Sequence, residues 1–275
     1  MYDMAALEAA LQNTIFSGRL YYSAVTGSTN SDAMAAARAG APHGSVYLAD
    51  EQLAGRGRGD HRWESAAGQG LYVSVLLRPG VSSRTLHLFP LAAGLAAAEA
   101  VFRVSRLTVD LRWPNDLLIS TPQTKTSPRE PRSDGRKTGG ILVESKTDRD
   151  EVAFVVIGIG INVHQQRFVS DVATPATSLD LALGRTISRQ ELLIALLESL
   201  ERETCCLHDP AVTAVLPARV EQVSTWLWDR QVEVHGPQAC TGVTAGLDEN
   251  GFLRVKTDKG FVTVQTGGIR AAKTD

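Results

Sequence analysis

Three glycines and three arginines are concentrated in one short stretch of this chain, Gly55-Arg56-Gly57-Arg58-Gly59-Asp60-His61-Arg62-Trp63. Glycine lets backbone N–H groups approach a ligand closely. Arginine supplies a planar, permanently charged fork that matches phosphate and carboxylate oxygens. This glycine–arginine loop, residues 55–63, is therefore typical of an anion-binding site. A basic surface loop in solvent is the alternative, and the segment alone does not distinguish the two.

Two further cations stand beside a sharp corner or a glycine pair. Arg112 precedes a Trp-Pro corner, and Lys137 lies two residues before a Gly-Gly pair. Like the arginines of the loop, both are expected at strand ends or between strands, where binding groups usually lie on a rigid scaffold. Such cations stabilise the charge that develops on a transferred phosphoryl group or a departing pyrophosphate. Asn115 and Asp116 add oxygen ligands that suit Mg2+.

Several common catalytic signatures are missing from the sequence. It contains no Gly-x-x-x-x-Gly-Lys-Ser/Thr loop, which argues against a P-loop NTPase, and no Gly-x-Ser-x-Gly elbow. The run Gly158-Ile159-Gly160-Ile161-Asn162 matches only half of a dinucleotide fingerprint, and the six histidines show no metal-ligand spacing. The cysteines, Cys205, Cys206 and Cys240, are expected to be buried, reduced thiols.

Length and charge limit the class of protein. A chain of 275 residues favours one large domain plus a small one. A formal net charge of −2 and a pI near 6.3 argue against a protein that coats nucleic acid. The sequence has no run of about 18 apolar residues and no basic leader at its N-terminus, so we expect a cytoplasmic protein.

Helical and strand patterns alternate irregularly over residues 1–228. Helices are expected over 4–12, from a cap at Thr29 to Gly40, over 86–104 with Pro90 in the first turn, and over 189–206. Strands are expected over 20–25, 45–50, 71–77, 107–112, 140–144 and 152–157, with a tight corner at 113–116 and a polar excursion over 120–136. This pattern predicts an α+β domain in which helices cover one face of a mixed β-sheet.

The pattern changes near residue 229. Short strands over 232–235, 241–247, 252–257 and 261–265 are separated by turn signals such as Asp248-Glu249-Asn250-Gly251. A β-barrel this small is stable only if it packs on its neighbour. We therefore expect two domains, residues 1–228 and 229–275.

Five motifs in a fixed order resemble the biotin protein ligases, also called biotin–[acetyl-CoA-carboxylase] ligases. They are Ser28-Thr29-Asn30, residues 51–58 with Trp63, residues 112–116, residues 137–144 and residues 158–162. Each motif is weak alone, and their conjunction is specific. The last 47 residues resemble the SH3-like barrel of that family. The implied fold is a catalytic domain related to class II aminoacyl-tRNA synthetases, followed by the barrel.

The resemblance implies a two-step reaction with ATP, Mg2+ and biotin. The biotin carboxylate attacks the α-phosphate of ATP, giving biotinyl-5'-AMP and pyrophosphate. A lysine of the biotin carboxyl carrier protein of acetyl-CoA carboxylase then attacks the activated carbonyl. With only 27 residues before Ser28, we expect no N-terminal winged-helix domain, no DNA partner and no membrane partner. Because family members often dimerise, a homodimer is a further expectation.

The resemblance also implies a role for individual residues. Biotin would be bound by Ser28, Thr29, Asn30, Gln52, Gly55, Arg56, Gly57, Arg58, Lys137, Gly140, Ile141, Leu142, Gly158 and Gly160. ATP or the adenylate would be bound by Arg56, Arg58, Trp63, Asn115, Lys137, Asn162 and Ala176, with residues 164–176 as a closing loop. The catalytic group would comprise Lys137, Arg112, Asp116 and Arg58, with Lys137 between the biotin carboxylate and the α-phosphate. Asn115 and Asp116 would hold Mg2+ or receive the carrier lysine.

The chain departs from the family pattern in its glycine–arginine loop. The usual sequence is Gly-Arg-Gly-Arg-x-Gly-Arg-x-Trp, whereas here Gly59 comes one position early, Asp60 takes the glycine position and His61 takes the arginine position. One cation is lost and an acid is gained, and Arg62 is the candidate to compensate. The loop is expected to be mobile without ligand, because a lid protects an acyl adenylate from water.

Other interpretations stay open at this stage. A lipoate or octanoate ligase would share the fold and the adenylation chemistry. A regulator that binds biotinyl-adenylate and acts on DNA, or a protein that sequesters the ligand with weak catalysis, is the non-enzymatic alternative. Residues 120–136 are longer than the connection usual in the family. A solvated insertion is favoured there over a partner contact.

Overall fold

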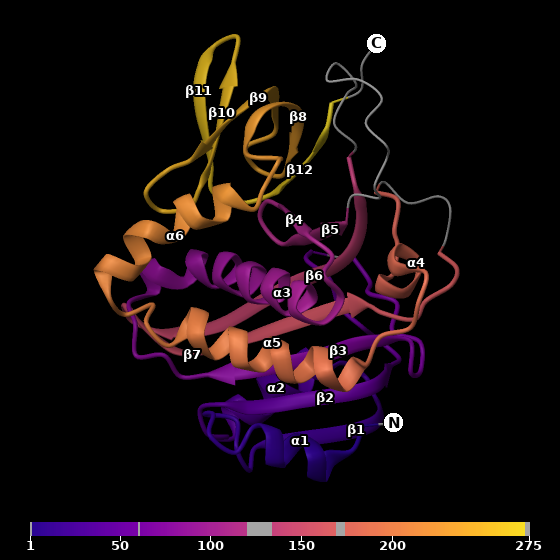
Figure 1. The fold of residues 1–275 in the computed structure, drawn as a ribbon. Helices are drawn as coiled ribbons and strands as arrows, with labels where there is room; N and C mark the ends of the chain where they lie inside the picture. The colour runs from indigo at the N-terminus through magenta and orange to yellow at the C-terminus, as the bar shows by residue number, and fades with distance from the viewer. Residues whose placement is uncertain (1, 60, 120–133, 169–173, 273–275) are drawn as a thin grey trace.

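The computed structural model describes residues 2–59, 61–119, 134–168 and 174–272. A seven-stranded mixed sheet with the strand order β1-β2-β3-β7-β6-β5-β4 forms the large part of the molecule, and a five-stranded antiparallel sheet follows it. Among the seven strands that the structure describes in this sheet, β1 and β2 pair in parallel and the other neighbours pair antiparallel. Figure 1 shows α3 and α5 side by side across the large sheet, with the second sheet beyond its β4 edge. The predicted α+β class is confirmed.

The helices of the described residues are α1 (Met4–Ala10), α2 (Thr29–Arg38), the 3-10 turn η1 (Ser83–Leu88), α3 (Phe89–Ser105), α4 (Leu179–Leu183), α5 (Arg189–Thr204) and α6 (Pro210–Gln222). The strands of the large sheet are β1 (Leu20–Thr26), β2 (Ser45–Gln52), β3 (Gly70–Leu77), β4 (Val109–Arg112), β5 (Asp116–Ile119), β6 (Arg136–Asp148) and β7 (Glu151–Asn162). The second sheet contains β8 (Trp228–His235), β9 (Cys240–Leu247), β10 (Leu253–Thr257), β11 (Gly260–Val264) and β12 (Gly268–Ala271).

The centre of the large sheet is covered on both faces, whereas the sequence predicted helices on one face. Every residue of β3 is buried, and β7 carries a continuous apolar run, as expected of strands with no solvent-facing side. Helices α3 and α5 pack on one face, while Ala33 and Ala37 of α2 pack with Phe154 on the other. The turn η1 and α3 together make a 23-residue helical stretch, Ser83–Ser105, which is long and apolar enough by composition to cross a membrane. Of its most apolar 18 residues, however, 61% are buried inside the protein.

The second sheet shares the core of the first. Val232, Val234 and Ile269 belong to the same buried cluster as α3 and β7. The indole N–H of Trp113 donates to the carbonyl of Gly251 at 3.2 Å, which joins the Trp-Pro corner to the turn before β10. The small sheet is thus stabilised by its neighbour, as its size requires.

Several local predictions differ from the structure. Helix α2 begins at Thr29 with Ser28 as its N-cap, one residue before the predicted cap. The strands β5 and β12 and the helices α4 and α6 were not anticipated; α6 contains Pro217, which obscures a helical pattern. Cys205 is exposed rather than buried, and Cys206 and Cys240 are half-buried free thiols. The excursion over 120–136 lies largely outside the described residues, and Arg136 begins β6.

Candidate active site

A cavity of about 1250 Å³ lies where the carboxyl end of β7, the start of β6 and the second sheet meet. All of the predicted site residues except Gly55 line it. Gly55 lies just behind the wall, where an added Cβ would be 2.3 Å from the carbonyl oxygen of Trp63. The five motifs are therefore brought together in one place. A volume of this size exceeds a typical single-ligand pocket and has room for two substrates.

Gly140, Gly158 and Gly160 form the floor of the cavity. Gly140 of β6 pairs with Gly160 of β7, and Leu142 pairs with Gly158, so the three glycines are neighbours in the sheet. A Cβ on Gly158 would lie 2.0 Å from Asn30 Oδ1, and a Cβ on Gly160 would lie 2.6 Å from the indole of Trp63. The Gly-x-Gly run that matched half of a dinucleotide fingerprint is thus a strand. It leaves space for two side chains above the sheet.

A chain of uncharged hydrogen bonds crosses this floor. Thr29 donates its N–H to Gln52 Oε1 at 2.9 Å, and its hydroxyl, 3.1 Å from the same oxygen, donates to the Ser74 hydroxyl at 2.8 Å. The Ser74 hydroxyl donates to Asn30 Oδ1 at 2.6 Å. At the other end, Gln52 Nε2 donates to Ser65 Oγ at 2.7 Å. Since Ser28, Thr29 and Asn30 are 3–4% exposed, the chain is held rigidly at the start of α2.

The glycine–arginine loop folds back on itself above the floor. The N–H of Trp63 donates to the carbonyl of Gly55 at 3.0 Å, and the N–H of Gly57 donates to the carbonyl of His61 at 2.8 Å. Gly59 adopts φ of 59°, the left-handed region that favours glycine, at the tip. The early position of Gly59 therefore serves the turn of this particular loop.

Three cationic side chains gather around one carboxylate. Asp116 accepts from Lys137 Nζ at 2.5 Å through Oδ1 and from Arg112 at 2.6 Å through Oδ2. Burial would raise the pKa of Asp116, but Lys137 and Arg112 outweigh it and hold that pKa below its ordinary value. Arg58 completes the group with bonds of 2.7 Å to the carbonyl of Gly267 and 3.4 Å to Asn115 Oδ1. Burial lowers the pKa of Arg58, and Asp116 opposes that shift.

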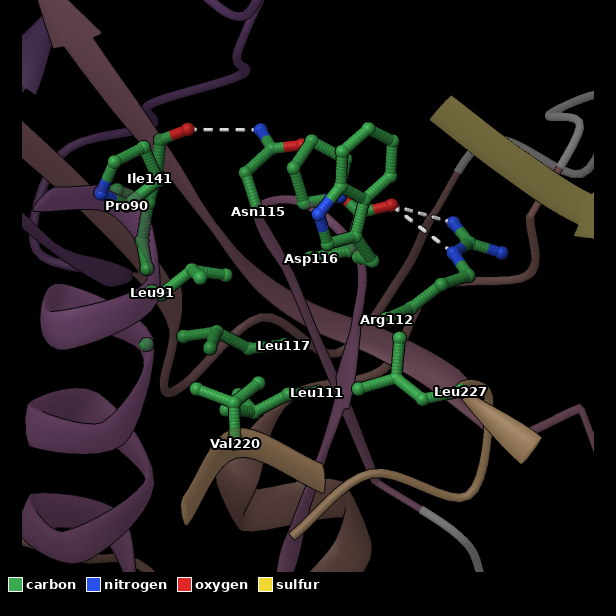
Figure 2. A pocket seen from close by; sticks show the side chains of 13 residues that line it. Pro90, Leu91, Leu111, Arg112, Asn115, Asp116, Leu117, Ile141, Val220 and Leu227 are labelled. Atoms are coloured by element: carbon green, nitrogen blue, oxygen red, sulfur yellow. Dashed lines mark hydrogen bonds and ion pairs between the residues drawn. The ribbon is translucent and has the colours of Figure 1, made fainter. Parts of the chain in front are cut away.

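The Trp-Pro corner between β4 and β5 brings Arg112 and Asp116 of this cationic group together. The Trp113–Pro114 peptide is cis, which turns the chain sharply between Arg112 and Asp116. Figure 2 shows the Asn115 amide reaching the carbonyl of Ile141, at 2.8 Å, and the Arg112 guanidinium against Asp116. Behind the corner is an apolar pocket of about 10 Å³, too small for a substrate.

The segment before α4 closes the far side. Arg112 donates to Thr174 Oγ1 at 2.9 Å, the N–H of Lys137 donates to the carbonyl of Pro175 at 2.8 Å, and Ala176 pairs with Lys137. Asn162 Nδ2 donates to the carbonyl of Thr177 at 3.2 Å. The predicted closing loop, 164–176, is thus anchored beside Lys137 at one end, and its residues 169–173 lie outside the described residues.

Sequence reasoning missed several contributors to the site. Ser74 and Ser65 complete the floor, Glu144 bonds to Asn30 and Arg56, and Gly267 receives Arg58. Gly267 lies between β11 and β12, in a segment for which the sequence predicted a barrel and no contact with the site. The signal for Ser74 was a lone polar residue inside the apolar run 71–77.

Comparison with known proteins assigns this fold and this cavity to a family of ligases. Residues 22–162 match the model of the biotin/lipoate A/B protein ligase family, and the chain belongs to that family. It is 30% identical over 94% of its length to the bifunctional ligase/repressor BirA of Bacillus subtilis, of which it covers 76%. It is 32% identical over 90% of its length to the biotin–[acetyl-CoA-carboxylase] ligase of Mycobacterium tuberculosis, of which it covers 86%.

Solved structures agree with this assignment. The biotin protein ligase of Aquifex aeolicus, in complex with biotin and ATP, superposes with a TM-score of 0.74 at 25% identity. The superposition covers 92% of this chain and 98% of that one. The likeness therefore includes the second sheet as well as the first.

Proposed function

We propose that this protein is a biotin protein ligase, which activates biotin as biotinyl-5'-AMP and transfers the biotinyl group to a lysine of a biotin carboxyl carrier protein. The observation that carries this proposal is the cavity itself, which joins an uncharged hydrogen-bonding floor to a cluster of three cations. Similar proteins named biotin–[acetyl-CoA-carboxylase] ligases support it, as does the similar ligase solved with biotin and ATP. Lipoate has no ureido ring to use such a floor.

Biotin binds over the glycine-paved floor. Its ureido ring is neutral and both donates and accepts hydrogen bonds, which suits the side chains of Ser28, Thr29, Asn30 and Gln52. Gly140, Ile141, Leu142, Gly158 and Gly160 supply the surface beneath the ring, and Gly55 and Gly57 let the loop close over it. The carboxylate at the end of the biotin tail then points to Lys137.

The adenylation step takes place beside Lys137. A biotin carboxylate oxygen attacks the α-phosphorus of ATP, the bond from that phosphorus to the bridging oxygen breaks, and pyrophosphate leaves. Lys137, Arg112, Arg56 and Arg58 stabilise the negative charge that gathers on the phosphoryl oxygens. Trp63, Asn162 and Ala176 hold the nucleoside. The carrier lysine amine then attacks the acyl carbonyl, the bond to AMP breaks, and the amine proton leaves.

Asp116 acts through its charge. Because Lys137 and Arg112 hold its pKa low, its carboxylate is a weak base and keeps both cations in place. The oxygens predicted to hold Mg2+ already face cations: those of Asp116 face Lys137 and Arg112, and that of Asn115 faces Arg58. The side chains in this arrangement therefore do not fit a resident Mg2+ ion.

The remaining features of the assignment are part of the proposal. Residues 1–228 form the catalytic domain and 229–275 the SH3-like domain. The protein acts in the cytoplasm on the carrier protein of acetyl-CoA carboxylase, without DNA or a membrane as partner. The predicted homodimer is to be tested by sedimentation velocity at several concentrations.

The direct test is carrier biotinylation. Purified protein is incubated with the apo carrier domain, ATP, Mg2+ and biotin, and the carrier is analysed by intact mass. The expected result is one biotinyl group, absent when ATP is omitted. Lipoate and octanoate are run in parallel, and transfer of either in preference to biotin contradicts the proposal.

A further inference from the structure

Glu144 lies on β6 beside the cavity, two residues beyond Leu142 and on the same face of the sheet, and is not one of the lining residues. Its side chain is 23% exposed, and its two oxygens have different partners. Oε1 accepts from Arg56 of the glycine–arginine loop at 2.7 Å, and Oε2 accepts from Asn30 Nδ2 at 2.9 Å. One carboxylate thus joins a residue of the floor to a residue of the loop.

The bond to Asn30 fixes the orientation of its amide. Asn30 Nδ2 faces the Glu144 carboxylate and, at 3.5 Å, the carbonyl of Leu142, while Oδ1 accepts from the Ser74 hydroxyl. A flipped amide would place its oxygen against two acceptors, so only one orientation is favourable. The amide that faces biotin in the proposed function is therefore set by a residue outside the cavity.

Glu144 also closes a circuit of hydrogen bonds. From Asn30 the floor chain runs through Ser74, Thr29 and Gln52 to Ser65, whose hydroxyl donates to the carbonyl of Trp63 at 3.2 Å. Arg56 and Trp63 lie near the two ends of the glycine–arginine loop. The loop is thus connected to the floor at both ends, and Glu144 supplies the connection at the Arg56 end.

We propose that Glu144 is a positioning residue. It orients the Asn30 amide for biotin, and it holds the glycine–arginine loop against the floor when biotin is bound there. The inference rests on the proposed function. An ion pair to Arg56, whose side chain is 45% exposed, contributes little to stability by itself. The consequence of Glu144 therefore lies in ligand binding and in loop position.

Glu144→Gln tests the proposal with little change of shape. A glutamine has one acceptor and one donor end, yet both partners, Arg56 and Asn30, are donors. One of them must lose its bond, and the expected result is a 10- to 100-fold weaker biotin affinity by calorimetry without ATP, from the loss of about one charge-assisted hydrogen bond. Biotinylation at saturating biotin should retain kcat within about threefold, because Arg56 is kept as a cation and the contacts of Lys137, Arg112 and Arg58 do not involve Glu144.

Loop position gives a second readout, which a merely structural role would not move. In the wild type we expect biotin to protect the loop from limited proteolysis, and in Glu144→Gln we expect that protection to be lost even at biotin concentrations that saturate the variant. Glu144→Asp, which keeps the charge, should restore part of the affinity. Glu198→Gln is the matched control, because it removes an exposed ion pair of 2.8 Å with Arg103 far from the cavity.

The outcomes are separable. Wild-type affinity and wild-type protection in Glu144→Gln overturn the positioning role. Failure of the wild-type protein to biotinylate the carrier overturns the proposed function instead. If Glu144→Gln lowers the melting temperature, a double-mutant cycle of Glu144→Gln with Ser74→Ala on biotin affinity decides, since both act on the Asn30 amide and their effects should not add. Additive effects contradict the proposal.

Discussion

The floor of the cavity differs from its cationic wall, formed by Lys137, Arg112 and Arg58, in the way that the polar groups are held. On the floor, Thr29, Ser74 and Gln52 are neutral, and each bonds to a neighbour that serves the same surface. On the wall, Lys137 and Arg58 are charged, and each bonds to a group that an anion could displace, Asp116 or the carbonyl of Gly267. The floor is complete without a ligand, whereas in the proposed function the wall exchanges its partners for phosphate.

This difference matches the two substrates. A neutral ureido ring gains most from a surface whose donors and acceptors are fixed in advance, because no group has to be reordered. A phosphate can compete with a carboxylate or a carbonyl for arginine and lysine, since its bonds to them are charge-assisted as well. Variants of the wall and of the floor should therefore fail in different ways.

The largest effect is expected from Lys137→Ala. Loss of the cation nearest to the proposed reacting atoms should reduce adenylation about 10²- to 10³-fold, the usual effect of removing one stabiliser of the transition state. Pyrophosphate release with biotin and ATP measures it. Lys146→Ala, an exposed lysine on the same strand, is the control and should leave the rate unchanged. A retained rate in Lys137→Ala would place the chemistry elsewhere.

Asp116→Asn should destabilise the fold most. It leaves Arg112, whose side chain is 7% exposed, and Lys137 without their shared counter-charge, and the free energy of unfolding should fall by about 3 kcal/mol. Urea titration measures this change. The result is contradicted if the variant unfolds at the same urea concentration as the wild type.

The same carboxylate gives a pH dependence. Because its pKa in the folded protein lies below the ordinary value of 3.8, ionised Asp116 stabilises the fold at every pH above 3.8, and the contribution is lost as the pH falls through the lower, folded pKa. The stability difference between wild type and Asp116→Asn should therefore be constant from neutral pH down to about pH 5 and shrink below about pH 4. A difference that grows on acidification is incompatible with this assignment.

Two single-methyl variants distinguish the ends of the floor. Gly158→Ala would place Cβ 2.0 Å from Asn30 Oδ1, and we expect biotin affinity to fall about 10-fold. Gly160→Ala would press on the Trp63 indole instead, and should raise the KM for ATP more than that for biotin. Steady-state kinetics with each substrate varied compares the two. If both variants change the KM for ATP and the KM for biotin in the same ratio, the floor and the wall do not bind different substrates.

The smallest effect should come from salt. Between about 0.05 and about 0.5 M NaCl, screening weakens attraction to the cationic wall, so the KM for ATP should rise about threefold. Biotin affinity of the free protein should change less, because the ureido ring meets an uncharged floor and biotin brings one negative charge to the wall, whereas ATP brings several. Equal salt dependence of both constants would remove the distinction between the two regions.

The sequence was sufficient for those parts of the site that are written as contiguous motifs. It predicted the buried strands from their apolar runs and the four cations from their positions beside glycines and corners. It could not show that Gly158 and Gly160 lie in a strand that extends to Asn162, because glycine lowers strand propensity and only the pairing with β3 and β6 restores it. Glu144 was visible in a motif, but its partners are 114 and 88 residues away.

The bond from Arg58 to Gly267 joins residues that are 209 positions apart. During synthesis, residue 267 is among the last to be made, long after Arg58. Until residue 267 has emerged and β12 has paired with β8, Arg58 lacks the carbonyl that holds it. A chain ending before β12 would therefore lack the contact of Arg58 with Gly267 and leave the cavity open on that side, while Arg56 kept its bond to Glu144.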